Sequence, residues 1–306
     1  MKVIKMKHVY VLAMVVVLVG TTVAADSATN TCSHTCGGKE VPYPFAINDT
    51  SSDSDCFLGG KLIPLICNES RIYAGDLEVL NIDIFKAEID VLFYVSKYCG
   101  GFVNEPKLNS GSYTISSKEN KFVTVGSDSY GYYNSYVGEN KYSTGCLTRS
   151  FGDQRSIDDG TCSGIGCCQV DIPPEMWNIS IEASNFNNES DFCSYAFVVK
   201  NDNYTFNLAH LSQGVPYEEL PVVLDWTIGD FNESCSTASS NNNGCKNNSH
   251  CYDQDMDFGY QCRCNPGFEG NPYHPNGCTG PFFIQILAIY VYFYFFFKLG
   301  ISLIAY

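Results

Sequence analysis

Short apolar runs alternate with polar clusters along most of this chain. The runs are rich in β-branched and aromatic residues, and Gly, Asn, Asp and Ser separate them. This spacing is typical of short strands joined by turns. No stretch has apolar positions at the period of a helix longer than about three turns. The runs that we predict to be strands are 77–84, 89–95, 121–125, 195–199 and 222–228.

The first 25 residues have the pattern of a secretory signal peptide. Three lysines within the first seven residues precede an apolar run over 9–19, and Ala24 and Ala25 follow it. A positive start, a short apolar stretch and a small-residue cleavage site are typical of a signal peptide. We predict cleavage after Ala25 and entry into the secretory pathway. The alternative, an N-terminal membrane anchor, fits less well because the apolar run is short.

A second apolar stretch covers 282–306, with Gln285 and Lys298 as its polar interruptions. A helix needs about 20 residues to span a bilayer, so this stretch is long enough. We predict a single membrane-spanning segment, although no basic cluster follows it. Two alternatives stay open. One is a lipid-anchor signal, which lacks the usual polar spacer here. The other is translated non-coding sequence from a truncated gene.

The chain has 16 cysteines, all after the predicted cleavage site. An even number of cysteines in an exported chain indicates disulfides. Zinc is a poorer interpretation, because C-x-x-C spacing is absent and His is scarce. The adjacent Cys167 and Cys168 should pair with different partners, since a bridge between neighbours is strained. We therefore predict a mainly β, disulfide-rich fold.

The spacing of the cysteines divides the exported part into two modules. Ten cysteines lie between 32 and 193, and six lie between 235 and 278. We predict a first module over 26–229 and a small second module over 230–279. Seven N-x-S/T patterns indicate a glycoprotein. The predicted glycosylation sites are Asn48, Asn68, Asn178, Asn188, Asn203, Asn232 and Asn247.

Acidic residues outnumber Lys and Arg by 33 to 18, and the formal net charge is −15. This charge excludes nucleic acid as a partner, because phosphate binding requires a basic face. Between 97 and 155 the acidic excess disappears, so an anion would bind there most readily. The Gly-rich loop and catalytic motifs of a protein kinase are absent, and no activated nucleophile stands out. We predict that this chain is not an enzyme.

Several motifs occur in a specific order between 32 and 228. CSHTCGG begins at Cys32, VPYPF at Val41, CSGIGCCQ at Cys162, CSYAF at Cys193 and LDWTI at Leu224. Together they resemble the galacturonan-binding module of plant wall-associated receptor kinases. The resemblance implies a cysteine-rich β module, outside the cell or at the plasma membrane, that binds pectin in the cell wall.

Two cysteines that members of this family usually carry are replaced here by Ser127 and Ser150. Both are missing and the total stays even. Our hypothesis is that they form one bridge in relatives and were lost here together. A bridge that closes a loop of this length contributes about 3 kcal/mol to stability.

The six cysteines of the second module resemble those of an epidermal-growth-factor-like (EGF-like) module. Six cysteines allow fifteen pairings. The resemblance implies three of them: Cys235–Cys251, Cys245–Cys262 and Cys264–Cys278.

Four residues around the start of this module are similar to the calcium ligands of some EGF-like modules. They are Asp230, Asn232, Glu233 and Asp253. In those modules the set abuts the first cysteine, whereas Ser234 is inserted before Cys235 here. Calcium requires six to eight oxygen ligands. We therefore keep calcium as a candidate cofactor, with a solvated acidic surface as the alternative.

We interpret the chain as the extracellular part of a truncated wall-associated receptor kinase-like protein that binds pectin, a homogalacturonan. The rival hypothesis is a protein-interaction decoy or co-receptor that captures another receptor through its EGF-like module. Galacturonan is a polyanion with sugar rings, so basic and tyrosine side chains are the candidate ligands for it. The candidate residues are Lys118, Lys121, Tyr132, Tyr133, Lys141 and Arg149.

Overall fold

The computed structural model describes residues 34–48, 65–109, 113–137, 140–149, 157–174, 176–186, 192–231, 233–238, 244–253 and 258–280. Strands make up most of these residues, and α2 (Ala209–Gln213) is the one helix among them. The predicted mainly β, disulfide-rich fold is confirmed. Each run predicted as a strand is found, as β5, β6, β11, β17 and β18. The predicted signal peptide and the apolar tail 282–306 lie outside the described residues.

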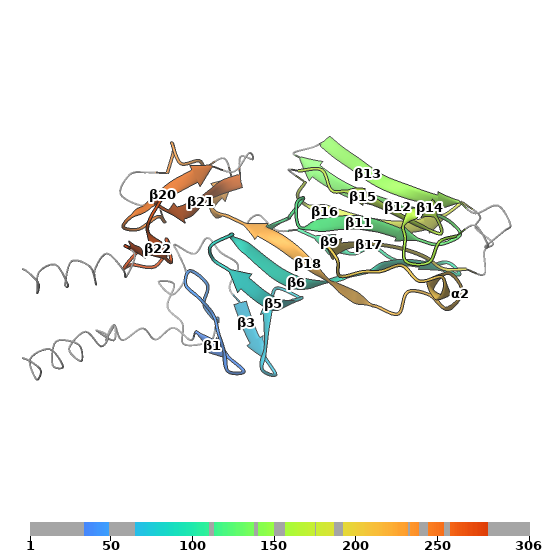
Figure 1. Cartoon of the computed structure of the whole chain (residues 1–306), viewed down its shortest axis with the longest axis horizontal. Helices are drawn as coiled ribbons and strands as arrows, with labels where there is room; N and C mark the ends of the chain where they lie inside the picture. Colours follow the sequence, from blue (N-terminus) through green and yellow to red (C-terminus); the bar gives the residue numbers. More distant parts are fainter. Residues whose placement is uncertain are drawn as a thin grey trace, which may run out of the picture. The chain divides into compact units, whose positions relative to one another are not determined.

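Six antiparallel strands form the first sheet, in the order β10-β18-β6-β5-β4-β3 (Figure 1). β6 alternates as a half-buried strand should, with Ile89, Val91 and Phe93 in the core. The Asp83 carboxylate accepts hydrogen bonds from the backbone N–H groups two and three residues on, which forms the turn after β5. The strands are β3 (Leu65–Asn68), β4 (Arg71–Ala74), β5 (Leu77–Asp83), β6 (Glu88–Tyr94), β10 (Tyr113–Ile115) and β18 (Glu219–Trp226).

Two further antiparallel sheets follow. The second sheet has the order β14-β15-β11-β17-β7-β8, and the third has the order β13-β12-β16-β9. The second comprises β7 (Ser96–Cys99), β8 (Phe102–Asn104), β11 (Asn120–Val125), β14 (Ser163–Ile165), β15 (Cys167–Asp171) and β17 (Ser194–Lys200). The third comprises β9 (Lys107–Leu108), β12 (Asp128–Val137), β13 (Asn140–Arg149) and β16 (Ile179–Asn185).

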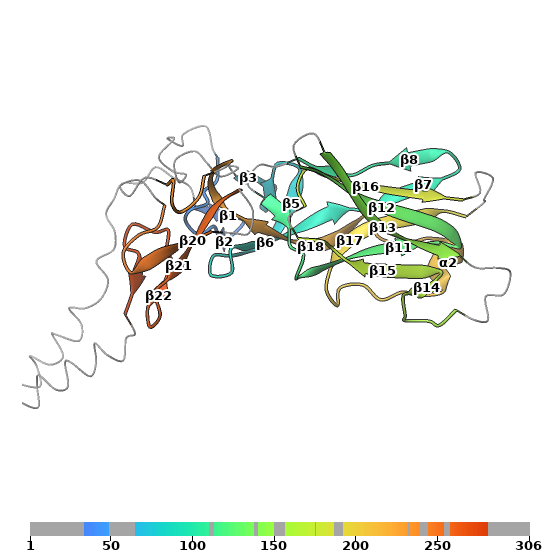
Figure 2. The same ribbon diagram turned by 90° about the horizontal axis from the view of Figure 1, so that it is seen from above.

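The second and third sheets pack face to face as a sandwich (Figures 1 and 2). Gly131 of β12 allows this approach, because a Cβ there would lie 2.4 Å from the Thr124 hydroxyl and 2.8 Å from the Ala196 Cβ. Polar contacts also join the two layers. The hydroxyl oxygens of Ser129 and Ser194 lie 2.7 Å apart between β12 and β17. Residues of odd number in β12 therefore face the second sheet.

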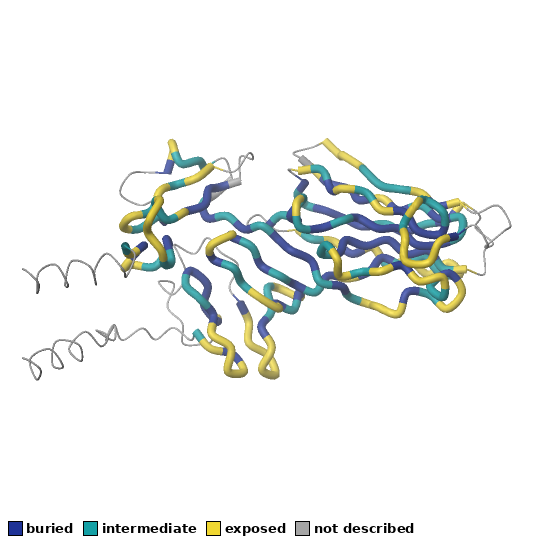
Figure 3. Tube along the Cα trace, in the orientation of Figure 1, coloured by how far each residue is buried: buried dark blue, intermediate teal, exposed yellow. Residues whose placement is uncertain are grey.

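β17 is buried on both faces (Figure 3). Ala196 and Val198 join the core on the side of the third sheet. Phe197 and Val199 join a second core, which the segment carrying α2 covers through Phe206 and other apolar residues. This double burial explains why the sequence of β17 reads as a continuous apolar run rather than an alternating one.

Asn120 connects the first and second sheets. Its amide nitrogen donates to the carbonyl oxygens of Ser116 and Val223, and its amide oxygen accepts from the Val223 N–H group. The Lys200 ammonium adds an ion pair with Asp90 at 2.8 Å. A buried amide is stable only when its donors and acceptors are paired, and here both ends are. The two sheets are thereby held in one arrangement.

The C-terminal strands form a small three-stranded sheet, in the order β19-β21-β20, and a two-stranded ribbon. One residue, Thr227, separates β18 from β19. The predicted boundary between 229 and 230 falls inside β19, and the division into two modules stays a prediction. The strands are β19 (Ile228–Phe231), β20 (Ser249–Asp253), β21 (Phe258–Cys264), β22 (Glu269–Gly270) and β23 (Cys278–Thr279).

Buried contacts join this small sheet to the N-terminal part of the chain. The rings of Trp226 and Tyr273 lie 5.1 Å apart, and those of Trp226 and Phe45 lie 5.0 Å apart. The Gln261 amide donates to the Trp226 carbonyl oxygen at 3.0 Å, and the Asn271 amide donates to the Tyr43 carbonyl oxygen. A short hairpin of β1 (Thr35–Cys36) and β2 (Lys39–Glu40) lies just before Tyr43 in the chain.

Seven disulfides join the cysteines of the described residues, and none of these cysteines is free. Cys167 and Cys168 pair with different partners, as their adjacency predicted. The bridge from Cys168 to Cys146 links the second sheet to the third. Cys32 and Cys56 lie outside the described residues. The pairs are Cys36–Cys67, Cys99–Cys193, Cys146–Cys168, Cys162–Cys167, Cys235–Cys251, Cys245–Cys262 and Cys264–Cys278.

Candidate functional site

The outer face of the third sheet carries a row of aromatic side chains, three of them exposed and one, Tyr130, half-buried. Residues of odd number in β12 face the second sheet, so Tyr130, Tyr132 and Tyr136 point away from it. Phe186, just after β16, lies on the same side, with its ring centroid 4.9 Å from that of Tyr130. The ring of Tyr132 lies 5.4 Å from that of Tyr130. We call these four residues the tyrosine face.

The tyrosine face is open to solvent. Tyr132 is 44% exposed, Tyr136 is 40% exposed and Phe186 is 43% exposed. Gly145 lies opposite Tyr132 on β13, so no side chain stands directly across from the ring on that strand. Contiguous exposed aromatic surface on a folded protein commonly marks a binding site.

Two cations flank this face. The Lys141 ammonium lies 5.9 Å from the Tyr136 ring centroid, and within the described stretches no carboxylate lies at ion-pair distance from it. The Arg149 guanidinium lies 4.9 Å from the Phe186 ring and 3.7 Å from an Asp128 carboxylate oxygen. Cations beside aromatic faces are a common arrangement for binding polar ligands that carry negative charge.

Three of the six predicted ligand-binding residues meet on this surface: Tyr132, Lys141 and Arg149. Lys121 does not. It shares the face of β11 with Val123, which packs in the core beneath α2, and its ammonium is paired with Asp171. Lys118 is exposed in the turn before β11, where its carbonyl oxygen accepts a hydrogen bond from the Asn201 amide. The six residues therefore do not form one patch.

The prediction for Tyr133 is wrong. Its side chain is fully buried between the second and third sheets, with its ring 6.0 Å from that of Phe122. Burial raises the pKa of its hydroxyl far above the usual range. A residue in this position packs the core and cannot contact a polysaccharide. Neighbouring residues of a strand point to opposite faces, so Tyr132 and Tyr133 could not both be exposed.

Sequence reasoning left Phe186 out of the candidate site. β16 carries a buried alternation at Ile179, Ile181 and Ala183, which indicates that even-numbered positions face outward. That alternation was the signal that could have placed Phe186 beside Tyr130. The nearby residue Asn188 was interpreted only as a glycosylation site, so Phe186 was not considered.

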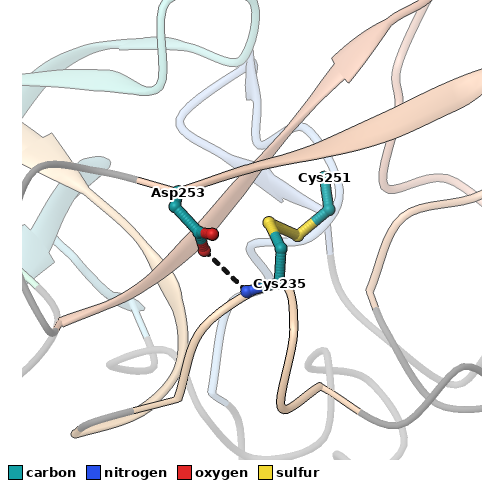
Figure 4. A group of neighbouring side chains, drawn as sticks. All are labelled: Cys235, Cys251 and Asp253. Carbon is teal, nitrogen blue, oxygen red and sulfur yellow. Dashed lines mark hydrogen bonds between the residues drawn. A yellow bond between two sulfur atoms is a disulfide. The ribbon is translucent and has the colours of Figure 1, made fainter.

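The predicted calcium ligands can be located only in part. Asp253 lies beside the Cys235–Cys251 disulfide, and its carboxylate accepts a hydrogen bond of 2.6 Å from the Cys235 N–H group (Figure 4). These cysteine sulfurs are covalently bonded to each other, so they are not thiolate ligands. The side chains of Asp230 and Asn232 lie outside the described part.

Glu233 is the other described member of the calcium set, and its carboxylate lies near Gly229 and Tyr260. Calcium requires six to eight oxygen ligands, and the structure places the side chains of only two of the four predicted ones. Calcium binding therefore stays a prediction. The three disulfides of this module are the pairs that the EGF-like resemblance implies.

Five of the seven predicted glycosylation sites can be placed. A glycan must face solvent, and the described asparagines satisfy this requirement. Glycosylation itself stays a prediction, and Asn188 and Asn232 lie outside the described residues. Asn48, Asn68, Asn203 and Asn247 are exposed, and Asn178 is half-buried.

Comparisons with known proteins identify relatives of this chain. Residues 159–235 match the family model described as wall-associated kinase. The chain is 33% identical over 260 residues to wall-associated receptor kinase 2 of Arabidopsis thaliana, covering 81% of this chain and 34% of the relative. Residues 159–235 carry the domain that this family model describes, and the chain is homologous to wall-associated receptor kinases over about 81% of its length.

Two further Arabidopsis thaliana relatives are similar. Wall-associated receptor kinase 1 is 32% identical over 264 residues, covering 81% of this chain and 34% of the relative. Wall-associated receptor kinase 5 is 30% identical over 288 residues, covering 90% of this chain and 38% of the relative. The chain thus spans about a third of the length of these receptor kinases. No solved structure matches it.

The wall-associated kinase homology supports an extracellular, wall-associated role for this chain. In the part of the chain that is described, no helix is both long enough and apolar enough to cross a membrane. The matched range contains β14 to β19 and α2, and it includes Phe186 of the tyrosine face. The three tyrosines of that face lie on β12, before the matched range.

Proposed function

We propose that this wall-associated kinase homologue binds acidic cell-wall polysaccharide, pectin galacturonan, through the tyrosine face. The observation that carries the proposal is the exposed aromatic row flanked by Lys141 and Arg149. Aromatic rings present flat apolar area on which the C–H face of a sugar ring can lie. A galacturonan chain that ran along this row would bring its carboxylates near Lys141 and Arg149, which could pair with them.

The proposed role of this portion is binding rather than catalysis. The Tyr132 and Tyr136 rings supply contact area, and Lys141 supplies charge without a described carboxylate competing for it. Because the whole chain carries a net charge of −15, the local cations must act at short range. We therefore expect binding to weaken as salt is added.

The test uses the whole chain secreted from plant cells and de-esterified pectin. Tyr132→Ala and the double variant Lys141→Gln with Arg149→Gln should each weaken binding about tenfold, since the few residues that dominate a binding site, often Tyr and Arg, each contribute more than about 1 kcal/mol. Tyr142→Ala is the matched control. Tyr142 is also an exposed tyrosine, but it lies opposite Ser135 and so points to the other side of the third sheet.

Unchanged affinity in Tyr132→Ala and in the double variant would overturn the tyrosine face as the site. A second arm repeats the assay with a calcium chelator. Binding that survives the chelator supports direct contact with the cations. Binding lost only in the chelator would mean that calcium bridges two acidic surfaces, which contradicts this proposal.

A further inference from the structure

A pocket of about 150 Å³ lies where β7 and β17 meet the segment that carries α2. Lys97 comes from β7, Tyr195 from β17, and Ser212 and Gln213 from α2 and its end. Tyr195 belongs to the core beneath α2, on the face of the second sheet that points away from the third. The pocket is therefore separate from the tyrosine face.

The Lys97 ammonium gives this pocket its charge. It is half-buried, its Nζ lies 5.8 Å from the Tyr195 ring centroid, and no described carboxylate lies at ion-pair distance from it. A partly desolvated cation without a counter-ion favours a bound anion. Ser212 and Gln213 add hydrogen-bonding groups to the lining. The pocket thus combines one cation, polar side chains and an aromatic wall.

The walls of the pocket are fixed by the fold. Cys193, at one edge, is bonded to Cys99. Gly214 lies at the opposite edge of the pocket, with φ +86°, a conformation that favours glycine. A Cβ at this position would lie 2.4 Å from the Tyr195 hydroxyl oxygen. The loop after α2 therefore lies directly against Tyr195. A pocket that is formed in advance binds its ligand with a smaller loss of conformational entropy.

We propose that this pocket binds a single carboxylated sugar residue, with its carboxylate toward Lys97. A cavity of about this volume holds one benzene molecule in another protein, and a uronic acid has about twice as many heavy atoms as benzene. The pocket is therefore sized for the carboxylate and the adjoining edge of the sugar ring, with the rest of the sugar at its mouth. The inference rests on the proposed function, because a galacturonan is a chain of such residues. A free uronic acid and the end of a short galacturonan chain present the same chemistry.

The experiment measures calorimetric binding of galacturonic acid, galactose and trigalacturonate to the whole secreted chain. We expect galacturonic acid to bind and galactose not to bind. Lys97→Gln should weaken galacturonic acid at least about tenfold, as loss of a charged hydrogen bond does. Lys97→Arg should retain binding. Lys121→Gln is the control, since Lys121 lies on the same face of the second sheet but is already paired with Asp171.

Each outcome separates this inference from the proposed function. If trigalacturonate competes with galacturonic acid, the natural ligand of the pocket is the end of a galacturonan chain. If only the monosaccharide binds, the ligand is the free sugar. If the wild-type chain binds no galacturonic acid, or Lys97→Gln binds it unchanged, the pocket proposal is overturned. Tyr132→Ala should bind galacturonic acid unchanged while its affinity for pectin falls about tenfold. Loss of both ligands in Tyr132→Ala would contradict two separate sites.

Discussion

Glu88 on β6 and Asp225 on β18 lie directly opposite each other. Burial is the main cause that raises the pKa of both carboxyl groups, and the Glu119 charge raises both further. Lys86 and Lys118 counter this effect for Glu88 and Asp225 respectively. Like charges opposite each other in a sheet are destabilising, so this pair weakens the first sheet when both are ionised.

The first prediction concerns pH. A carboxyl group whose pKa is higher in the folded state binds more protons there, so stability falls as pH rises from the ordinary value of 3.8 through the raised pKa of Asp225. We expect Asp225→Asn to be more stable than the wild-type chain at pH 7 and equally stable at pH 3. Urea unfolding with the disulfides intact, between pH 3 and 8, measures this. A difference that does not vary with pH would contradict the assignment.

The second prediction concerns the two serines that replace family cysteines. Ser127 precedes Asp128, Ser150 follows Arg149, and Asp128 and Arg149 are cross-strand partners. Ser150 itself lies outside the described residues. We expect Ser127→Cys with Ser150→Cys to form a bridge and to stabilise the chain by about 3 kcal/mol.

Mass spectrometry under non-reducing conditions detects this bridge, and thermal unfolding detects its effect on stability. The single variant Ser127→Cys is the control and should give no stabilisation. Two free thiols in the double variant would refute the hypothesis that the lost cysteines were a pair.

The third prediction concerns the contact between Tyr273 and Trp226, which are both fully buried in one continuous core. The Tyr273 hydroxyl oxygen accepts a hydrogen bond of 3.0 Å from the Cys262 N–H group. Tyr273→Phe should cost about 1 kcal/mol, and Tyr273→Ala about 3–5 kcal/mol. Calorimetry should show one unfolding transition in the wild-type chain. Two separate transitions would mean that the small C-terminal sheet unfolds independently of this core.

The fourth prediction separates structure from calcium at Asp253. Because its carboxylate caps the Cys235 N–H group, Asp253→Ala should lower stability by about 1 kcal/mol both in calcium and in chelator. Asp253→Asn keeps an acceptor oxygen and should lose less. Thermal unfolding measures both variants. A loss seen only with calcium present would show instead that Asp253 acts as a ligand.

The sequence predicted the strands well, because runs such as 77–84 and 89–95 are rich in β-branched and aromatic residues. The adjacency of Cys167 and Cys168 also predicted that they have separate partners, because a bridge between neighbours is strained. The orientation of β12 was harder. Its tyrosines occur at both even and odd positions, and tyrosine suits a core as well as a surface. Only the packing against the second sheet decides that Tyr133 is inside and Tyr132 is outside.

The pocket at Lys97 illustrates a second limit. Lys97 and Gln213 are far apart in the sequence, and their meeting depends on the path of the segment that covers β17. No local pattern carries that information. Lys121 and Lys141 failed to meet for the related reason that charge counted along the chain ignores which face of a strand each residue occupies.

The single residue between β18 and β19 has a mechanical consequence. β18 lies between β10 and β6, which pair with its residues 224–226 and 219–225 respectively. A force applied to the C-terminal sheet would be transmitted through Thr227 to this interior strand, because a one-residue link can hardly extend. The load would act along the strand, in shear across many hydrogen bonds at once, rather than by peeling them apart one at a time.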